Sequence, residues 1–307
     1  MTYRLDEVAL REAKALAARQ PRCDLVIPWL PALPSPPVAT DLLAVYRQGE
    51  TYSATVGELV VTPPPPPPTY DQLVLATPGL THYWPLNDAA GSGTVADKVG
   101  GVALAVHGNV QLGAPPVCTD GETTVRFLGT PVGDGLPSGE VADYITLPSS
   151  VFPSGGPFSV EFIAADGWVT GQVPGVGIMV CNGGLPSDPG FDMYSSGGAT
   201  PEYTISGPSG GDYSAIYIGY ARTAHFVLVY DNLGTSTSVR TYINGWWITS
   251  NSATTYGNMF GTAGGFIGKR VDNSDGYVGR IGKLAIYNVA LTNAQIYTHF
   301  NQGGVNQ

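Results

Sequence analysis

The side chains that could perform chemistry in this 307-residue sequence are carboxylates, histidines and aromatic rings. A glycan hydrolase needs two carboxylates that face each other across the bond to be cut, about 5–9.5 Å apart. The nearest pair, Glu161 and Asp166, would point to opposite faces of an uninterrupted strand. The string G-P-S-G-G at residues 207–211 matches G-x-S-x-G, but no helix is predicted after it, so it does not predict the strand-turn-helix of a nucleophile elbow. The four histidines show no metal-ligand spacing: His82, His107, His225 and His299. We therefore expect a protein without catalytic residues that is not an enzyme.

Two short polar stretches could offer oxygen ligands to calcium, which prefers carboxylate and amide oxygens. The first contains Asn87, Asp88 and Asp97, and the second is Asp-Asn-Ser-Asp-Gly at residues 272–276. Asp, Asn and Gly also favour tight turns for reasons of their own backbone geometry. We expect a turn at the second stretch. At the first, calcium is the one candidate cofactor, and a turn is the competing interpretation.

Exposed aromatic faces and short polar side chains are the groups that bind sugars. Trp246 and Trp247 are adjacent in a predicted strand, so their side chains should point to opposite faces and only one can enter the core. The exposed tryptophan is the first candidate for sugar contact. Tyr217, Tyr220 and Tyr256 offer further aromatic surface, although tyrosine also suits a half-buried strand.

The composition excludes several classes of protein. With 14 basic and 24 acidic residues, the net charge is −10, which is the wrong sign for binding nucleic acid by phosphate neutralisation. No segment approaches the roughly 18 apolar residues of a membrane span. The 3 cysteines (Cys23, Cys118 and Cys181) are too few and too scattered for a disulfide framework, and the last two are expected to be buried. The frequent Gly, Thr, Ser, Tyr and Val indicate β structure.

Six consecutive prolines divide the chain. Pro63 to Pro68 should form a stiff polyproline II rod, which predicts a linker over residues 63–79 between an N-terminal region (1–62) and a large domain (80–307).

The N-terminal region cannot bury its own apolar groups, because it is too short to form a core. Residues 2–20 have a helical pattern, a proline-rich extended segment follows, and the alternation over residues 41–61 predicts a small hairpin. We expect this region to dock on other chains and to support a homotrimer. The residues expected to make these contacts are apolar or aromatic: Leu5, Ala9, Ala13, Leu16, Trp29, Leu30, Tyr46 and Tyr52.

The sequence of the large domain predicts short strands separated by turns, and many such strands indicate a two-sheet sandwich. Asn244-Gly245 is the sequence of a type I′ hairpin turn. One helix is predicted after Leu291, with Thr292 and Gln295 as its capping box and Gly303 past its end. The clearest strands are residues 124–128, 143–147, 158–163, 213–218, 224–230, 238–243 and 279–287.

Three segments of this domain resemble the concanavalin A-like lectin/glucanase jelly roll, close to its laminin G-like group. They are Y-W-P-L-N-D at 83–88 with the glycine-rich stretch to Asp97, the hairpin at 226–245, and the closing strand and Y-N-V-A-L-T exit at 277–292. The resemblance implies a mainly β antiparallel sandwich that binds carbohydrate. Glycanases of this fold take their carboxylates from an E-x-D-x-x-E strand, which is missing here. Gly282 stands where the family usually has an acidic residue, which weakens the case for a metal.

Residues 41–59, D-L-L-A-V-Y-R-Q-G-E-T-Y-S-A-T-V-G-E-L, resemble an N-terminal segment of tailed-bacteriophage structural proteins. This resemblance implies a fibre, spike or capsid decoration on the virion surface, assembled in the host cytoplasm. Its N-terminus would dock on capsid, portal, adaptor or tail proteins, and its sandwich would face the host glycans. Two alternatives remain open: a polysaccharide depolymerase on the same fold, and a free carbohydrate-binding module unrelated to virions.

Overall fold

The computed structural model describes residues 42–47, 50–55, 66–128, 143–166, 176–183, 190–196, 202–206, 212–217, 223–232, 237–252, 264–271 and 276–305. The chain divides into two compact units, Met1–Pro66 and Pro67–Gln307. Six of the residues expected to make anchor contacts lie outside the described residues: Leu5, Ala9, Ala13, Leu16, Trp29 and Leu30. No helix in the described part of the chain is long and apolar enough to cross a membrane.

The first unit contains a two-stranded antiparallel hairpin at the place where the alternation predicts one. Strand β1 (Leu42–Arg47) pairs with β2 (Glu50–Thr55), and Val45 lies opposite Tyr52. Tyr46 lies opposite Thr51 in the same register.

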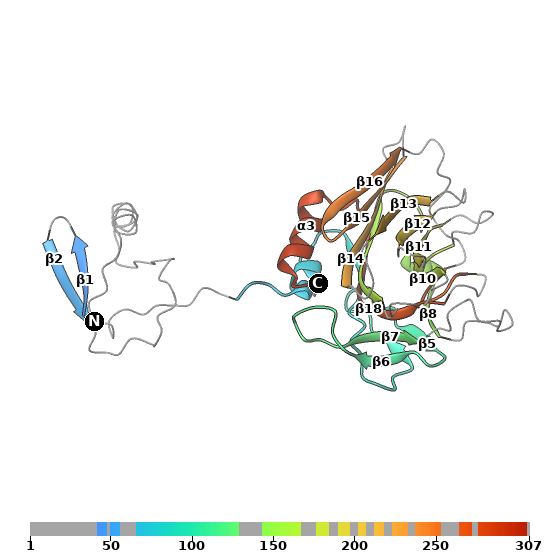
Figure 1. Cartoon of the computed structure of the whole chain (residues 1–307), viewed down its shortest axis with the longest axis horizontal. Coiled ribbons are helices and arrows are strands. Elements are labelled where there is room, and N and C mark those ends of the chain that lie inside the picture. Colours follow the sequence, from blue (N-terminus) through green and yellow to red (C-terminus); the bar gives the residue numbers. More distant parts are fainter. Residues whose placement is uncertain are drawn as a thin grey trace. The chain divides into compact units, whose positions relative to one another are not determined.

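The second unit is a sandwich of two eight-stranded antiparallel sheets (Figure 1), as the sequence predicts. The first sheet has the order β16-β15-β14-β9-β18-β7-β6, with β3 also paired to β18. The second has the order β13-β12-β11-β10-β17-β8-β5-β4. Strands of the first sheet are β3 (Leu80–Trp84), β6 (Gln111–Ala114), β7 (Thr124–Leu128), β9 (Phe158–Asp166), β14 (Thr223–Asn232), β15 (Thr237–Ile243), β16 (Trp246–Ser252) and β18 (Val278–Tyr287). Strands of the second are β4 (Thr94–Val95), β5 (Leu104–His107), β8 (Tyr144–Leu147), β10 (Val176–Cys181), β11 (Asp192–Ser196), β12 (Glu202–Ser206), β13 (Asp212–Tyr217) and β17 (Gly265–Ile267).

Strand β9 shows how the alternation of side chains builds two apolar layers. Phe158, Val160 and Phe162 point into the core between the sheets. Ile163 and Ala165 point to the outer face of the first sheet, where they join a second buried cluster. Cys118 and Cys181 are buried free thiols, as predicted, and burial raises the pKa of Cys118 to about 12.

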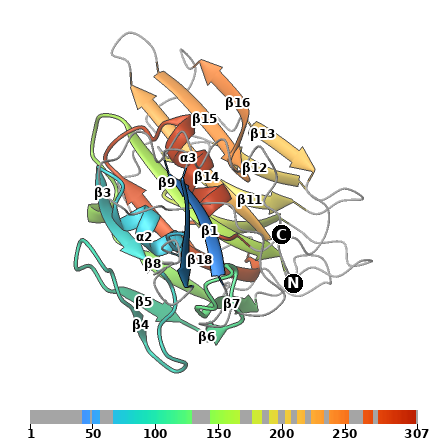
Figure 2. The same cartoon turned by 90° about the vertical axis from the view of Figure 1, so that its left-hand side faces the viewer.

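Two helices cover this outer face, α2 (Tyr70–Leu75) and α3 (Asn293–Gln302) (Figure 2). Helix α3 has the predicted capping box of Thr292 and Gln295. Helix α2 was not predicted, and its presence corrects the linker expected over residues 63–79. Thr69 and Gln72 form the same kind of capping box there, and Tyr70 and Val74 are fully buried. A short 3₁₀ turn spans Ser149–Val151.

The predicted turn at Asn244-Gly245 is present, with φ values of 52° and 75°. A Cβ atom at position 245 would also lie only 3.0 Å from Cδ1 of Phe300 in α3. Glycine is therefore required at this turn both by the left-handed backbone and by the helix packed against it.

This double requirement gives a testable prediction. Gly245→Ala should destabilise the protein by about 2 kcal/mol, since both the backbone strain and the contact with Phe300 oppose the methyl group. Gly121→Ala is the matched control, because Gly121 has the same φ of 75° but a Cβ atom there would meet nothing within 4 Å. The free energy of unfolding of the control, measured by urea denaturation, should fall by about 1 kcal/mol. Equal losses in the two variants would show that the helix contact contributes nothing.

Candidate functional site

Trp246 and Trp247 begin β16, directly after the turn, and both side chains are exposed, at 65% and 57%. The expectation that one of them enters the core is wrong. The pairing of β15 with β16 shifts between Thr241, opposite Thr249, and Tyr242, opposite Trp247, so the strand carries one extra residue. The extra residue is Ile248, which packs against the core, whereas Trp246 and Trp247 keep regular partners, Ile243 and Tyr242. Both tryptophans are exposed because they begin the edge strand of the sheet, where neither face is fully covered.

Tyr297 of α3 lies beside Trp246 at this edge of the sandwich. Its side chain is 46% exposed, and its ring lies 6.1 Å from that of Trp246 in an edge-to-face arrangement. We call Trp246, Trp247 and Tyr297 the aromatic platform. The described part of the chain has six exposed large apolar residues, and three of them lie at this edge: Trp246 and Tyr297 in ring contact, and Trp247 next to Trp246 in the strand. Their exposure marks the platform as a candidate interaction site.

Of the three tyrosines proposed as further sugar contacts, only Tyr217 lies within the described residues. Tyr217 lies in β13, opposite Glu202, and β13 approaches β16. Tyr220 and Tyr256 lie outside the described residues, as does most of the 272–276 loop.

Polar groups lie beside the platform. Asn293 precedes Tyr297 by one helical turn, and its Oδ1 accepts hydrogen bonds from the hydroxyl of Tyr242 at 2.6 Å and from Nη1 of Arg240 at 3.3 Å. Since Tyr242 is the cross-strand partner of Trp247, these polar groups lie on the same face of the sheet as Trp247.

The residues considered as calcium ligands form hydrogen bonds with other groups of the protein. Asn87 Nδ2 donates to Glu122 Oε2 at 2.8 Å, and Asp88 Oδ1 accepts from the backbone N–H of Ala96 at 3.1 Å. Both carboxylate oxygens of Asp97 accept hydrogen bonds, which are the contacts a calcium ion would have to replace. Burial alone would raise the pKa of Asp97, but these hydrogen bonds lower it. The donors are Nδ1 of His82 and the backbone amides of Tyr83, Val99, Gly100 and Val102.

A second acidic group already contains a cation of the protein's own. Carboxylate oxygens of Asp71, Asp120 and Glu122 lie within 4.8 Å of one another. The Nζ of Lys283 lies 2.6, 2.8 and 2.7 Å from them, respectively, and its side chain is fully buried. Burial alone would lower the pKa of Lys283, but its hydrogen bonds to the three carboxylates outweigh burial and raise it. The ammonium group thus occupies the centre of this cluster and balances one of its three negative charges.

We therefore predict that calcium and EDTA leave thermal stability unchanged. The unfolding temperature of the full chain in EDTA and in millimolar CaCl₂ should agree within about 1 °C, since a ligand that does not bind the native state does not stabilise it. Differential scanning calorimetry measures this directly. A clear fall in the unfolding temperature on chelation would instead establish calcium as a structural cofactor.

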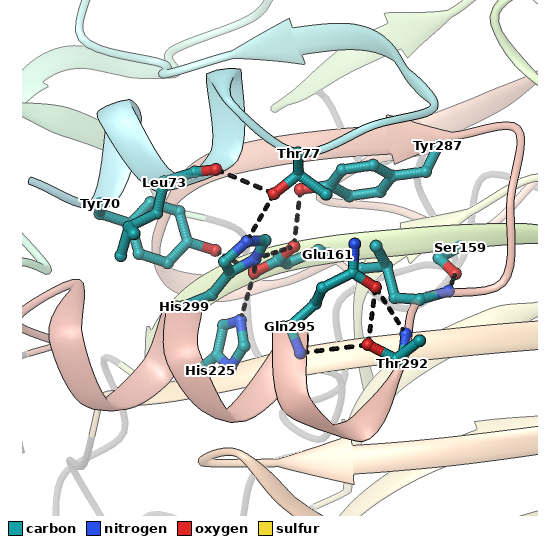
Figure 3. Close-up of polar contacts among 11 residues, drawn as sticks. Tyr70, Leu73, Thr77, Ser159, Glu161, His225, Tyr287, Thr292, Gln295 and His299 are labelled. Atoms are coloured by element: carbon teal, nitrogen blue, oxygen red, sulfur yellow. Dashed lines mark hydrogen bonds and ion pairs between the residues drawn. The ribbon is translucent and has the colours of Figure 1, made fainter. Parts of the chain in front are cut away.

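Beneath α2 and α3 lies a buried carboxylate, that of Glu161 (Figure 3). Its Oε1 contacts Nε2 of His225 at 2.6 Å, and it accepts a hydrogen bond from the hydroxyl of Tyr70 at 2.6 Å. Its Oε2 accepts from the hydroxyl of Tyr287 at 2.8 Å. Nδ1 of His299 lies 2.9 Å from Oε1 and 3.0 Å from Oε2. One side chain thereby joins α2, β9, β14, β18 and α3.

The protonation of His299 follows from the hydrogen bonds of Thr77. The hydroxyl of Thr77 has one proton, and it donates to the carbonyl of Leu73 at 2.8 Å. The same hydroxyl lies 2.8 Å from Nε2 of His299. All these contacts are satisfied together only when His299 carries a proton on both ring nitrogens.

Glu161 and His299 therefore form a buried ion pair. Burial alone would raise the pKa of Glu161, but the charge of His299 and the hydrogen bonds from His225 and His299 hold it well below the usual range. Burial, followed by the charge of Glu161, raises the pKa of Tyr70 and Tyr287, which remain hydrogen-bond donors at neutral pH.

The cluster contains acid and base groups typical of an active site, yet no substrate can reach it. Glu161 and His225 are 0% exposed and His299 is 2% exposed. What the cluster can do is fix the two helices to the sheet. Sequence spacing gives no sign of it, because Glu161 lies 64 residues from His225 and 138 from His299.

Comparisons with known proteins agree with this architecture. Residues 138–297 match the family described as the concanavalin A-like lectin/glucanases superfamily. No curated protein matches the chain. Domain 4 of AbnA, an extracellular arabinanase from Geobacillus stearothermophilus solved with arabinotriose, is similar at 16% identity and a TM-score of 0.50, over 72% of this chain and 97% of that one.

The receptor-binding domain of botulinum neurotoxin C/D mosaic serotype is similar at 12% identity and a TM-score of 0.50. The alignment covers 73% of this chain and 51% of that one, so this chain spans about half the length of the neurotoxin domain. At these identities the likeness concerns the fold alone. The family match, in contrast, covers more than half of the sequence, and the chain belongs to the concanavalin A-like lectin/glucanases superfamily.

Proposed function

We propose that the sandwich binds a glycan through the aromatic platform and does so as the displayed domain of a bacteriophage virion protein. The observation that carries the binding proposal is the gathering of Trp246, Trp247 and Tyr297, all exposed, at one edge of the sandwich. The arabinanase domain of the same fold, solved with arabinotriose, supports a sugar as the ligand.

The chemistry of the platform suits a sugar ring. Aromatic faces pack against the apolar C–H faces of a pyranose or furanose, while neighbouring polar groups bind its hydroxyls. The edge-to-face contact of Tyr297 with Trp246 restrains one indole, so less conformational freedom is lost on binding. Asn293 and Arg240 border the rings and offer amide and guanidinium groups to hydroxyls.

An array of immobilised bacterial cell-surface glycans, probed with the labelled full chain, tests the binding proposal. Binding to one glycan class, with competition by the same glycan in solution, is the expected result. Failure to bind any glycan on the array would count against it.

The virion role is supported by the segment at residues 41–59 and by the division of the chain into two units. We propose that the first unit anchors the protein to capsid, portal, adaptor or tail proteins as a homotrimer. The fragment Pro67–Gln307 is the appropriate truncation, because it retains the Thr69 cap of α2. If this fragment folds but no longer joins particles, the anchor proposal holds; normal incorporation would refute it.

The competing proposal, a polysaccharide depolymerase, requires carboxylates that a glycan can reach. Glu161, the carboxylate with histidine neighbours, is 0% exposed. Release of reducing ends from purified capsular polysaccharide, abolished by substitution of a surface carboxylate, would favour the depolymerase.

A further inference from the structure

A second surface site lies in a shallow depression beside the edge strand β6. The depression has a volume of about 480 Å³ and is lined by residues 90–91, residues 110–115 and Arg126. Strands β6 and β16 are at opposite ends of the first sheet, so the depression is separate from the aromatic platform.

Small residues and a bulge create this depression. Gly113 has a φ of 77° at the register shift between Leu112 and Ala114, where β6 departs from regular pairing with β7. A Cβ atom at Gly113 would make ordinary contact with the Cβ of Ala90, at 3.5 Å, while one at Gly91 would meet nothing within 4 Å. The walls therefore leave space that larger side chains would fill.

A row of polar side chains crosses the sheet at the depression. Arg126 is exposed and lies directly opposite Gln111 of β6 on one side and Arg280 of β18 on the other. Cross-strand partners share a face of the sheet, so the two guanidinium groups are neighbours. Nη1 of Arg280 donates to the carbonyls of Pro115 and Pro116, both at 3.1 Å, which fixes it against the wall of the depression.

Arg126, in contrast, is available to a ligand. Within the described ranges, no residue forms a hydrogen bond or ion pair with its guanidinium group. Two adjacent positive charges on a chain of net charge −10 form a local site for an anion. The guanidinium fork binds a planar carboxylate through two parallel hydrogen bonds, and Gln111 can bind hydroxyls beside it.

We propose that this depression binds the carboxylate of an acidic sugar, a uronic or sialic acid residue, with Arg126 as its main contact. A volume of this size accommodates one or two sugar rings. The proposal goes beyond the function proposed above, because it names a second site and a charged class of ligand. It holds or fails independently of the aromatic platform.

The test is isothermal titration of the full chain with trigalacturonate, glucuronate oligomers and sialyllactose. Each is compared with its neutral counterpart: the methyl ester or the sugar lacking the acid. At least one acid should bind while its neutral counterpart does not. Arg126→Gln, an exposed position where folding should be unaffected, should weaken binding about tenfold or more, and Arg126→Lys should recover only part of it.

The double variant Trp246→Ala/Trp247→Ala is the control, and it should bind the acid as the wild type does. Three results would overturn the proposal: no binding of any acid, equal binding of the neutral counterpart, or undiminished binding by Arg126→Gln. Loss of acid binding in the tryptophan variant but not in Arg126→Gln would assign the acid to the aromatic platform instead.

Discussion

Glu161→Gln is expected to destabilise the protein by about 3–5 kcal/mol, the usual effect of removing one partner of a buried ion pair. The amide would leave the imidazolium of His299 without a counter-charge, and its NH₂ group would face donors from Tyr70, Tyr287 and His225. Urea denaturation of the full chain, followed by tryptophan fluorescence, measures the loss.

Glu122→Gln is the matched control for this change. The Glu122 side chain is 38% exposed and shares Lys283 with two other carboxylates. This substitution should therefore lower the free energy of unfolding by less than about 1 kcal/mol. If Glu161→Gln also stays within about 1 kcal/mol of the wild type, the cluster does not hold the helices to the sheet.

The stability of the protein should depend on pH through the same carboxylate. Because the pKa of Glu161 is lower in the folded state than the ordinary value of 4.5, its contribution is complete above about pH 4.5. That contribution is lost as the pH falls below this value towards the folded-state pKa. The stability of the wild type should therefore fall more steeply on acidification than that of Glu161→Gln, and parallel curves would contradict the ion pair.

Trp246→Ala/Trp247→Ala is expected to weaken glycan binding about 100-fold, because aromatic anchors at the centre of a binding site dominate its affinity. Both side chains are more than half exposed, so the unfolding free energy should change little. Tyr297→Phe should retain binding because it keeps the ring against Trp246, whereas Tyr297→Ala should lose part of it.

Val99→Ala, which shortens an apolar side chain that is 44% exposed elsewhere on the surface, serves as the control. Fluorescence titration with the glycan identified on the array gives the affinities. Unchanged affinity in the double tryptophan variant would place the sugar elsewhere on the sandwich.

The local parts of the fold were predictable because their signals are local. Strand β9, the Asn244-Gly245 turn and the Thr292 capping box each depend on residues close in sequence. Helix α2 carries the same capping signal at Thr69 and Gln72, but it has only six residues and follows the proline run. Its stability comes from burying Tyr70 and Val74, which no local pattern shows.

The candidate sites were predictable only in part. The exposure of both tryptophans depends on the place of β16 at the edge of the sheet, and strand order is not visible in one strand alone. Glu161, His225 and His299 meet only because three distant segments converge. The available clue was the position of Glu161, which lies on the opposite face of β9 from Val160 and Phe162.

The central claim, that the aromatic platform is the glycan-binding surface, is tested most directly by NMR of the tryptophan indole N–H groups. The chain has 5 tryptophans, so their signals can be assigned with single Trp→Phe variants. During titration with the best glycan of the array, the signals of Trp246 and Trp247 should shift and saturate together while that of the buried Trp84 stays in place. Saturable binding that leaves both of the exposed signals unmoved would contradict the account.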